Sequence, residues 1–354
     1  MNKEFKGWNK ELNQIGKIIL EKERECLESL GRGLTPDNCD ERYPDQYFKE
    51  VGYNLWAGYE KNGVQVHYPH FKEYGGADGG ELKDSEKTPA KMKSIRSSSA
   101  MTYNLLGNES VEIKGTERFS KGTYKVEYEK KLYTLKGNPH PANLDAYLYK
   151  KDSQEAIFCE MKMMEWIFNK PGFLREAYCD AGNYYSSAAA DTKTTDAFLK
   201  AIKMLKAEML PDEGIFYRYD AWQMFKHTLG IYNMTSDITR KEISRLITNS
   251  RAKNGRSIAE VPELHKVTLL NVVFEPSEGL FTGELKEIYQ RVKELERENF
   301  MQFRKAMVES GVVEAFERDC HIDFDIQYMS AAQFMNCFEL GERKDFLERY
   351  RLKI

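Results

Sequence analysis

Glu160 and Lys162 place two opposite charges inside an otherwise apolar run, "EAIFCEMKMMEW". Asp145 interrupts the preceding run, "NLDAYLYK", in the same way. The polar segment "KKDSQ" between them predicts a β-hairpin with strands over 143–150 and 155–163. With the turn centred in that segment, Asp145 lies directly across from Glu160, where side chains are about 5 Å apart. We therefore expect two carboxylates and one ammonium to meet in this hairpin.

A divalent cation would relieve the repulsion between the two carboxylates, because like charges opposed across strands destabilise a sheet. Two carboxylates, a backbone carbonyl and waters can complete the octahedral oxygen shell that Mg²⁺ prefers, with Mn²⁺ as the alternative ion. Lys162 would then orient a water or steady the charge that develops on a phosphate. The alternative is a surface ion pair of little energetic weight, since short D…ExK patterns arise by chance.

Alternation along the two strands predicts one apolar face and one charged face. The apolar face, suited to a layer of helices, carries Leu144, Ala146, Leu148, Ile157, Cys159 and Met161. The other face carries Asn143, Asp145, Tyr147, Phe158, Glu160 and Lys162. All three charged side chains are therefore expected to project from the same face.

Helical periodicity and capping residues predict the elements around this hairpin. Thr88 and Pro89 are interpreted as the N-cap and first residue of a helix that ends at Gly107. Helices are expected over 2–30, 89–106, 172–187, 194–210, 216–232, 237–249 and 280–309. Further strands are expected near 122–135, over 265–274 and in "DFDIQYMS". The chain is thus predicted to be one α/β domain with a helical N-terminal arm and a loop-rich segment over 31–88.

These elements, in this order, resemble the PD-(D/E)xK superfamily of restriction-endonuclease-like nucleases. That family has an αβββαβ core, in which an antiparallel meander bears Asp and then Glu-x-Lys. The segments "RSSSAMTYNLLG", "LDAYL", "EMKMMEW" and "WQMFKHTLG" resemble a bacterial branch with S-S-Q-A and F-N-L in the first helix, E-x-K-Y-T-E in the last catalytic strand and Q-x-x-K-H in the second helix. The resemblance implies an α/β core over 89–275 with a mixed central sheet flanked by helices. An N-terminal helix and loop-rich arm over 1–88 and C-terminal helices and a strand over 276–354 would be additions to it.

The resemblance also implies roles for single residues. Asp145 and Glu160 would hold the metal, and Lys162 would be the catalytic lysine. The possible accessory residues are Glu165, Ser98, Asn104, Gln223, Lys226 and His227. The chain departs from the branch at Ser99, where Gln is expected, and at the two methionines after Lys162, where Tyr-Thr is expected.

Two of these assignments have structural alternatives. Ser98 and its serine neighbours can donate hydrogen bonds to a phosphate, or can let a helix pack closely on the sheet. His227 can shuttle a proton or contact a phosphate, or can be a buried structural residue, because it lies among apolar helical positions. Gln223 would share its helix face.

Charge and composition limit the class of protein. The net charge of -3 excludes an obligate nucleic-acid coating protein, but local basic patches occur. Residues 238–256 carry six basic residues and one acidic residue, and residues 83–96 carry five and two. Each patch would contact phosphates or form the solvated face of a helix. The six scattered cysteines predict reduced thiols, and the absence of a long apolar run predicts a cytoplasmic protein with no membrane partner.

The hypothesis that follows is a Mg²⁺-dependent nuclease that hydrolyses phosphodiester bonds, with DNA favoured as the partner. The first alternative is a nucleic-acid- or protein-binding module that retains the nuclease fold without cleavage. The second is an α/β protein in which the charged trio is a salt bridge. DNA or RNA, endo- or exonuclease action, sequence specificity, oligomeric state and a role in defence, repair or mobile elements all stay open.

Overall fold

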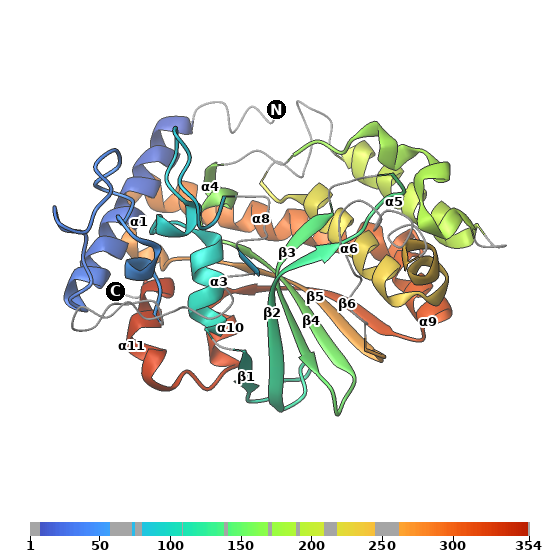
Figure 1. Cartoon of the computed structure of the whole chain (residues 1–354). Coiled ribbons are helices and arrows are strands. Elements are labelled where there is room, and N and C mark those ends of the chain that lie inside the picture. Colours follow the sequence, from blue (N-terminus) through green and yellow to red (C-terminus); the bar gives the residue numbers. More distant parts are fainter. Residues whose placement is uncertain are drawn as a thin grey trace.

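A single six-stranded sheet forms the centre of the protein (Figure 1). The computed structural model describes residues 8–56, 73–74, 80–107, 109–137, 141–168, 172–188, 192–208, 218–244 and 262–352. In spatial order the strands are β1 (Ser110–Ile113), β2 (Gly122–Leu132), β3 (Ala142–Lys150), β4 (Glu155–Lys162), β5 (Lys266–Val273) and β6 (Asp323–Ser330). The first four strands form an antiparallel meander, and β5 and β6 continue the sheet parallel to β4. The predicted α/β architecture with a mixed sheet is thus observed.

The two central strands, β4 and β5, explain the most apolar runs of the sequence. All of β4 except Lys162 is buried, and all of β5 except Lys266. A strand with neighbours on both edges and helices on both faces has no side chain that reaches solvent, so its sequence loses polar alternation. A polar residue on either strand is therefore buried and requires a partner.

Helices cover both faces of the sheet. Among the described residues, the α-helices include α1 (Asn9–Ser29), α3 (Ser98–Leu106), α4 (Glu165–Phe168), α5 (Lys193–Glu208), α6 (Ala221–Thr235), α8 (Gly283–Glu309), α9 (Val312–Cys320), α10 (Ala331–Asn336) and α11 (Lys344–Leu347). Short 3₁₀ turns are η2 (Val51–Asn54), η3 (Lys91–Lys93), η4 (Glu176–Cys179), η5 (Ala181–Asn183), η6 (Tyr185–Ala188), η7 (Glu278–Leu280), η8 (Gly341–Arg343) and η9 (Glu348–Tyr350). Within the described ranges, no helix is both long and apolar enough to cross a membrane.

The two faces of the sheet carry separate apolar cores. Ile157 and Cys159 of β4 pack in one core with residues of α1, α3 and α10. Phe158 packs in the other with residues of α5, α6 and α9. The long helix α8 runs behind the sheet and contributes to both, through Tyr289 to the first and Phe303 to the second (Figure 1). The α6 face is therefore the side on which Glu160 lies.

The helix expected over 89–106 begins later than predicted. Ser97, not Thr88, is the N-cap, and its hydroxyl accepts a hydrogen bond from Ala100 N. The residues before it form a 3₁₀ turn and pair with another segment, because Phe48 N donates to Lys93 O and the Ile95 N–H donates to a carbonyl of the same segment. The predicted end is correct: Gly107 is left-handed, with φ 60°.

The helix expected over 172–187 is also wrong, since three 3₁₀ turns occupy that segment. Asp180 caps the second turn by accepting from Gly182 N, and the Asn183 side chain donates to Ala177 O. Such side-chain to backbone bonds compete with helical ones. Of the helix expected over 237–249, residues 237–244 are helical and residues 245–249 lie outside the described residues. Residues 2–7 of the helix expected over 2–30 also lie outside them.

Candidate active site

Glu160 lies at the centre of a hydrogen-bonded cluster on the α6 face of the sheet. Its side chain is buried, yet both carboxylate oxygens have partners. Lys162 Nζ donates to Oε1 at 2.7 Å, and Gln223 Nε2 donates to the same oxygen at 2.8 Å. His227 Nε2 lies 2.9 Å from Oε2. Lys162 Nζ also donates to Gln223 Oε1 at 2.6 Å, so the four side chains form one network.

Helix α6 supplies Gln223 and His227 because residues four apart lie on one helix face. Asp220 caps the helix and accepts from Gln223 N at 2.9 Å, which fixes its start beside β4. His227 is buried and touches Glu160 directly. The prediction that these two helix residues share a face is confirmed, and that face is turned toward the predicted catalytic strand.

The partners of Glu160 in the network hold its carboxyl group ionised. Burial alone would raise its pKa, but Lys162 and then His227 outweigh burial and lower the pKa to about 2. Burial likewise opposes the charged form of Lys162, yet Glu160, Glu165 and Asp145 raise its pKa above the ordinary value. A carboxylate and an ammonium therefore coexist inside the fold at neutral pH.

Asp145 lies where the backbone ladders on both sides of β3 are interrupted. The β3–β4 register is the predicted one, but the ladder ends at Ala146–Cys159, one residue before Asp145 would pair with Glu160. Met161 N instead donates to Asp145 Oδ2 at 2.6 Å. Burial, followed by the charge of Glu160, raises the pKa of Asp145 well above its usual range. The direct cross-strand pair is thus replaced by a carboxyl group set between two separating strands.

The alternation of β3 breaks at the same residue, which corrects one predicted face. Leu144 packs with the α6 core, whereas Ala146 packs with the opposite core, so the two residues do not share a face. On β2, Glu129 is unpaired opposite Asp145 and adopts φ 49°, a left-handed conformation unusual for glutamate. Burial and neighbouring acidic residues, Glu160 among them, raise the pKa of Glu129 to about 8.

Of the predicted accessory residues, Glu165 lies on α4, next to the network, and Lys226 lies on α6, which contributes to it, whereas two others lie on α3. Glu165 lies close enough to raise the pKa of Lys162, and its Oε2 accepts from Met163 N at 2.7 Å at the start of α4. Lys226, on the same helix as the network, has no hydrogen bond or ion pair with any described residue and is half-buried.

The two accessory residues on α3 lie apart from the cluster. Asn104 Nδ2 donates to Asn54 O and to Tyr350 Oη, and its Oδ1 accepts from Trp56 N, so its described partners are structural. Ser98 belongs to the first turn, where its carbonyl accepts from Thr102. Helix α3 covers the sheet face opposite α6, so neither residue reaches the network.

Two of the five basic residues in the segment over 83–96 form ion pairs within the fold. Lys93 is buried and paired with Asp84 at 2.7 Å, and Lys91 lies 3.1 Å from Glu81. It is also not a helical face, as its residues form loops and one 3₁₀ turn. Of the second segment, residues 238–244 are described and helical, while 245–256 lie outside the described residues.

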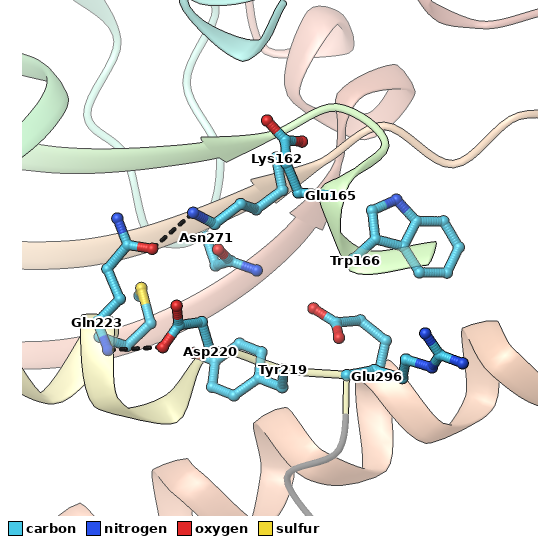
Figure 2. A pocket seen from close by; sticks show the side chains of 10 residues that line it. Lys162, Glu165, Trp166, Tyr219, Asp220, Gln223, Asn271 and Glu296 are labelled. Atoms are coloured by element: carbon cyan, nitrogen blue, oxygen red, sulfur yellow. Dashed lines mark hydrogen bonds between the residues drawn. The ribbon is translucent and has the colours of Figure 1, made fainter. Parts of the chain in front are cut away.

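A cavity of about 200 Å³ opens beside Lys162, between β4, β5 and the helices α6 and α8 (Figure 2). Its walls include residues that the sequence did not point to: Arg218, Tyr219, Asp220, Asn271 and Glu296. The sequence does indicate Asn271 as a site residue, because this amide interrupts the apolar strand "KVTLLNVVFEP" as Glu160 interrupts β4. The two residues are neighbours in the parallel β4–β5 register. Nothing in the sequence distinguishes Glu296, since it lies within a long charged helix.

The site offers two carboxylates to a cation and no larger ligand set. Within the described part of the chain, no three His, Cys, Asp or Glu side chains are arranged to hold a metal ion together. A carboxylate accepts about four hydrogen bonds or metal contacts. Glu160 uses three, and one oxygen of Asp145 accepts a single bond from Met161 N. Capacity for a cation is thus left on both side chains.

No known protein family, curated protein or solved structure matches the chain.

Proposed function

We propose that the protein is a Mg²⁺-dependent nuclease that hydrolyses phosphodiester bonds of nucleic acid, DNA in the first place, with Mn²⁺ as a substitute. The observation that carries the proposal is the network of buried Glu160 and His227 with half-buried Lys162 and Gln223 beside Asp145. A purely structural salt bridge would not explain why Asp145, a second carboxyl group with a raised pKa, lies beside it at a break in the sheet. Perturbed carboxyl groups in pairs are typical of catalytic sites.

The order of elements supports the same proposal. Helix α3, strands β2–β4, helix α6 and strand β5 occur in this order along the chain, with β1 between α3 and β2 and with α4 and α5 between β4 and α6, and the strands belong to one sheet. This is the αβββαβ order of the PD-(D/E)xK nucleases, which the sequence resembles. Asp145 and the Glu160–Lys162 pair occupy the second and third strands of that meander.

The residues present fit a divalent cation. Asp145, Glu160 and Glu129 bring three carboxyl groups close together, and burial first and neighbouring carboxyl groups second raise the pKa of Asp145 and of Glu129. Asp145 and Glu160 would hold the ion, with waters completing the shell that Mg²⁺ keeps. When bound, the ion supplies positive charge to the phosphate and lowers the pKa of a bound water.

Lys162 has the donors that a phosphate-hydrolysing site needs. Two of the three N–H bonds of its ammonium group point to Glu160 and Gln223. The third can donate to the attacking water or to a phosphate oxygen. Because its pKa is raised, the group stays charged through the reaction and stabilises the developing negative charge.

Cleavage of labelled single- and double-stranded DNA and of RNA, with Mg²⁺, Mn²⁺ or chelator, tests the proposal. Asp145→Asn, Glu160→Gln and Lys162→Met are each expected to lower the rate at least ~100-fold. Lys125→Met is the matched control, because Lys125 is an exposed lysine on another strand of the same sheet. Thermal melting and calorimetric titration with Mg²⁺ separate a lost site from a lost fold.

Two outcomes would overturn the proposal. Wild-type cleavage rates in folded Lys162→Met would remove Lys162 from the chemistry. Nucleic-acid binding without cleavage under either metal would instead support a binding module that keeps the fold.

A further inference from the structure

The cavity beside Lys162 has walls from four parts of the chain. β4 and α4 contribute Lys162, Glu165 and Trp166, and the segment before α6 and its first turn contribute Arg218, Tyr219, Asp220, Gln223 and Met224. β5 contributes Asn271 and α8 contributes Glu296 (Figure 2). Its volume of about 200 Å³ equals that of about seven liquid waters at ~30 Å³ each. The space therefore suits one small ring system and not a base pair.

Three buried polar atoms in this wall have no hydrogen-bond partner among the described residues. They are Asn271 Nδ2, Tyr219 Oη and Glu296 Oε2, on residues that are 1 %, 1 % and 2 % exposed. Buried polar atoms almost always have partners. Since they belong to three separate elements and line one cavity, a ligand with several polar atoms would satisfy them together.

The chemistry of these atoms selects the kind of ligand. The amide of Asn271 donates, and the hydroxyl of Tyr219 donates or accepts. Burial raises the pKa of Glu296 to about 8, so at neutral pH its carboxyl group donates as well as accepts. Adjacent donors and acceptors on amide and carboxyl groups are the means by which proteins bind the edges of nucleobases.

Other ligands fit less well. A metal ion would need several ligands in contact, and no such group of three His, Cys, Asp or Glu side chains exists among the described residues. A phosphate would meet the acidic residues Glu165 and Asp220 in the same wall, which Lys162 and Arg218 also line. A neutral, planar, polar ring avoids both difficulties.

We infer that this cavity takes one unpaired nucleobase of the substrate, with Asn271, Tyr219 and Glu296 contacting its polar edge. The inference rests on the proposed nuclease function, because it places the base next to the phosphate that Lys162 would contact. A base inside a duplex stack cannot enter such a cavity without being extruded. Single strands, frayed ends and mismatched positions are therefore the preferred substrates over the interior of an intact duplex.

Calorimetric titration of the protein with the four deoxynucleosides, in chelator, tests the cavity without any cleavage. At least one nucleoside is expected to bind. Tyr219→Phe and Glu296→Gln are each expected to lower the affinity for that nucleoside about tenfold. Both variants keep the shape of the side chain. Glu294→Gln is the control, an exposed glutamate on the same helix. Asn271→Leu adds a third test, with thermal melting to establish that it folds.

Cleavage assays then connect the cavity to the reaction. A single-stranded oligonucleotide with one abasic position is expected to lose cleavage at the adjoining bond, while its other bonds are cut as before. Failure of every nucleoside to bind, or equal binding by the wild type and all three variants, would overturn the inference. Equal cleavage rates inside a duplex and in a single strand would do the same and leave the nuclease function standing. If no nucleic acid is cut with either metal, the proposed function fails, while nucleoside binding that the variants weaken still supports the cavity as a base site.

Discussion

Replacing Lys162 with methionine leaves Glu160 as a buried carboxylate without its ammonium partner. The pKa of Glu160 is about 2 in the folded protein, against an ordinary 4.5. At about 1.4 kcal/mol per unit, the partners of the carboxylate stabilise the fold by about 3 kcal/mol at neutral pH. Breaking a buried ion pair from one side costs a similar ~3–5 kcal/mol. Lys162→Met is therefore expected to lower the free energy of unfolding by about 3 kcal/mol at pH 7.

The pH dependence of this loss has a definite sign. Because the pKa of Glu160 is lowered on folding, its contribution is fully present above pH 4.5 and disappears as the pH falls through about 2. At pH 3, about one unit above the folded pKa, about 1.4 kcal/mol of it remains. The difference between the wild type and Lys162→Met should thus be roughly halved at pH 3.

Urea unfolding, followed by circular dichroism and tryptophan fluorescence at pH 7, 5 and 3, measures this difference. The double variant Glu160→Gln/Lys162→Met should recover most of the loss, because neither charge is then left buried. Lys125→Met, at an exposed lysine, should change stability by less than ~0.5 kcal/mol. A cost for Lys162→Met no larger than that of this control at pH 7, or a cost that does not fall at pH 3, would refute the reasoning.

Two further predictions concern the elements around the site. Gly230→Ala should cost about 1–3 kcal/mol in thermal or urea unfolding and weaken Mg²⁺ binding, because the new Cβ would lie 2.6 Å from Leu132 Cβ and push α6 from the sheet. Gly172→Ala, where the structure leaves open space, is the control, and equal stability of the two variants would contradict the packing. Burial raises the pKa of Glu23 to about 8, so its contribution to stability, complete below pH 4.5, is lost at up to ~1.4 kcal/mol per pH unit as the pH rises toward 8. Glu23→Gln should flatten urea stability between pH 5 and 8, and an unchanged slope would show that Glu23 titrates normally.

Local patterns in the sequence predicted the sheet well and the irregular segments poorly. Strands β2 to β6 were predicted because turns, alternation and apolar runs are encoded within a few residues. The segment over 172–187 looked helical, but side chains such as Asp180 and Asn183 bind nearby backbone groups instead. The start of α3 was misplaced because the residues before it pair with a segment almost fifty positions away.

The residues of the candidate site were likewise predicted where local patterns determine their positions and missed where distant segments do. The hairpin register and the contact of Glu160 with Lys162 were predicted from local patterns, but the break in alternation at Asp145 was not. The contribution of Glu296 could not be predicted, because it depends on how α8 crosses the sheet more than one hundred residues after β4. Asn271, by contrast, could have been predicted from the sequence. A single amide within an apolar strand indicates a buried polar group that needs a partner.

The two carboxyl groups of the site are held very differently, and this difference suggests how they divide the work. Glu160 is held by three side chains and stays ionised, so in the proposed nuclease it would be the constant ligand of the cation and would position Lys162. Asp145 lies at breaks in both of its ladders, opposite a glutamate of strained backbone, and has one described hydrogen bond. Strain of this kind persists where function requires it. A carboxyl group with a raised pKa and few contacts can lose its proton and turn toward a cation at little structural cost, which a fully paired strand residue could not do.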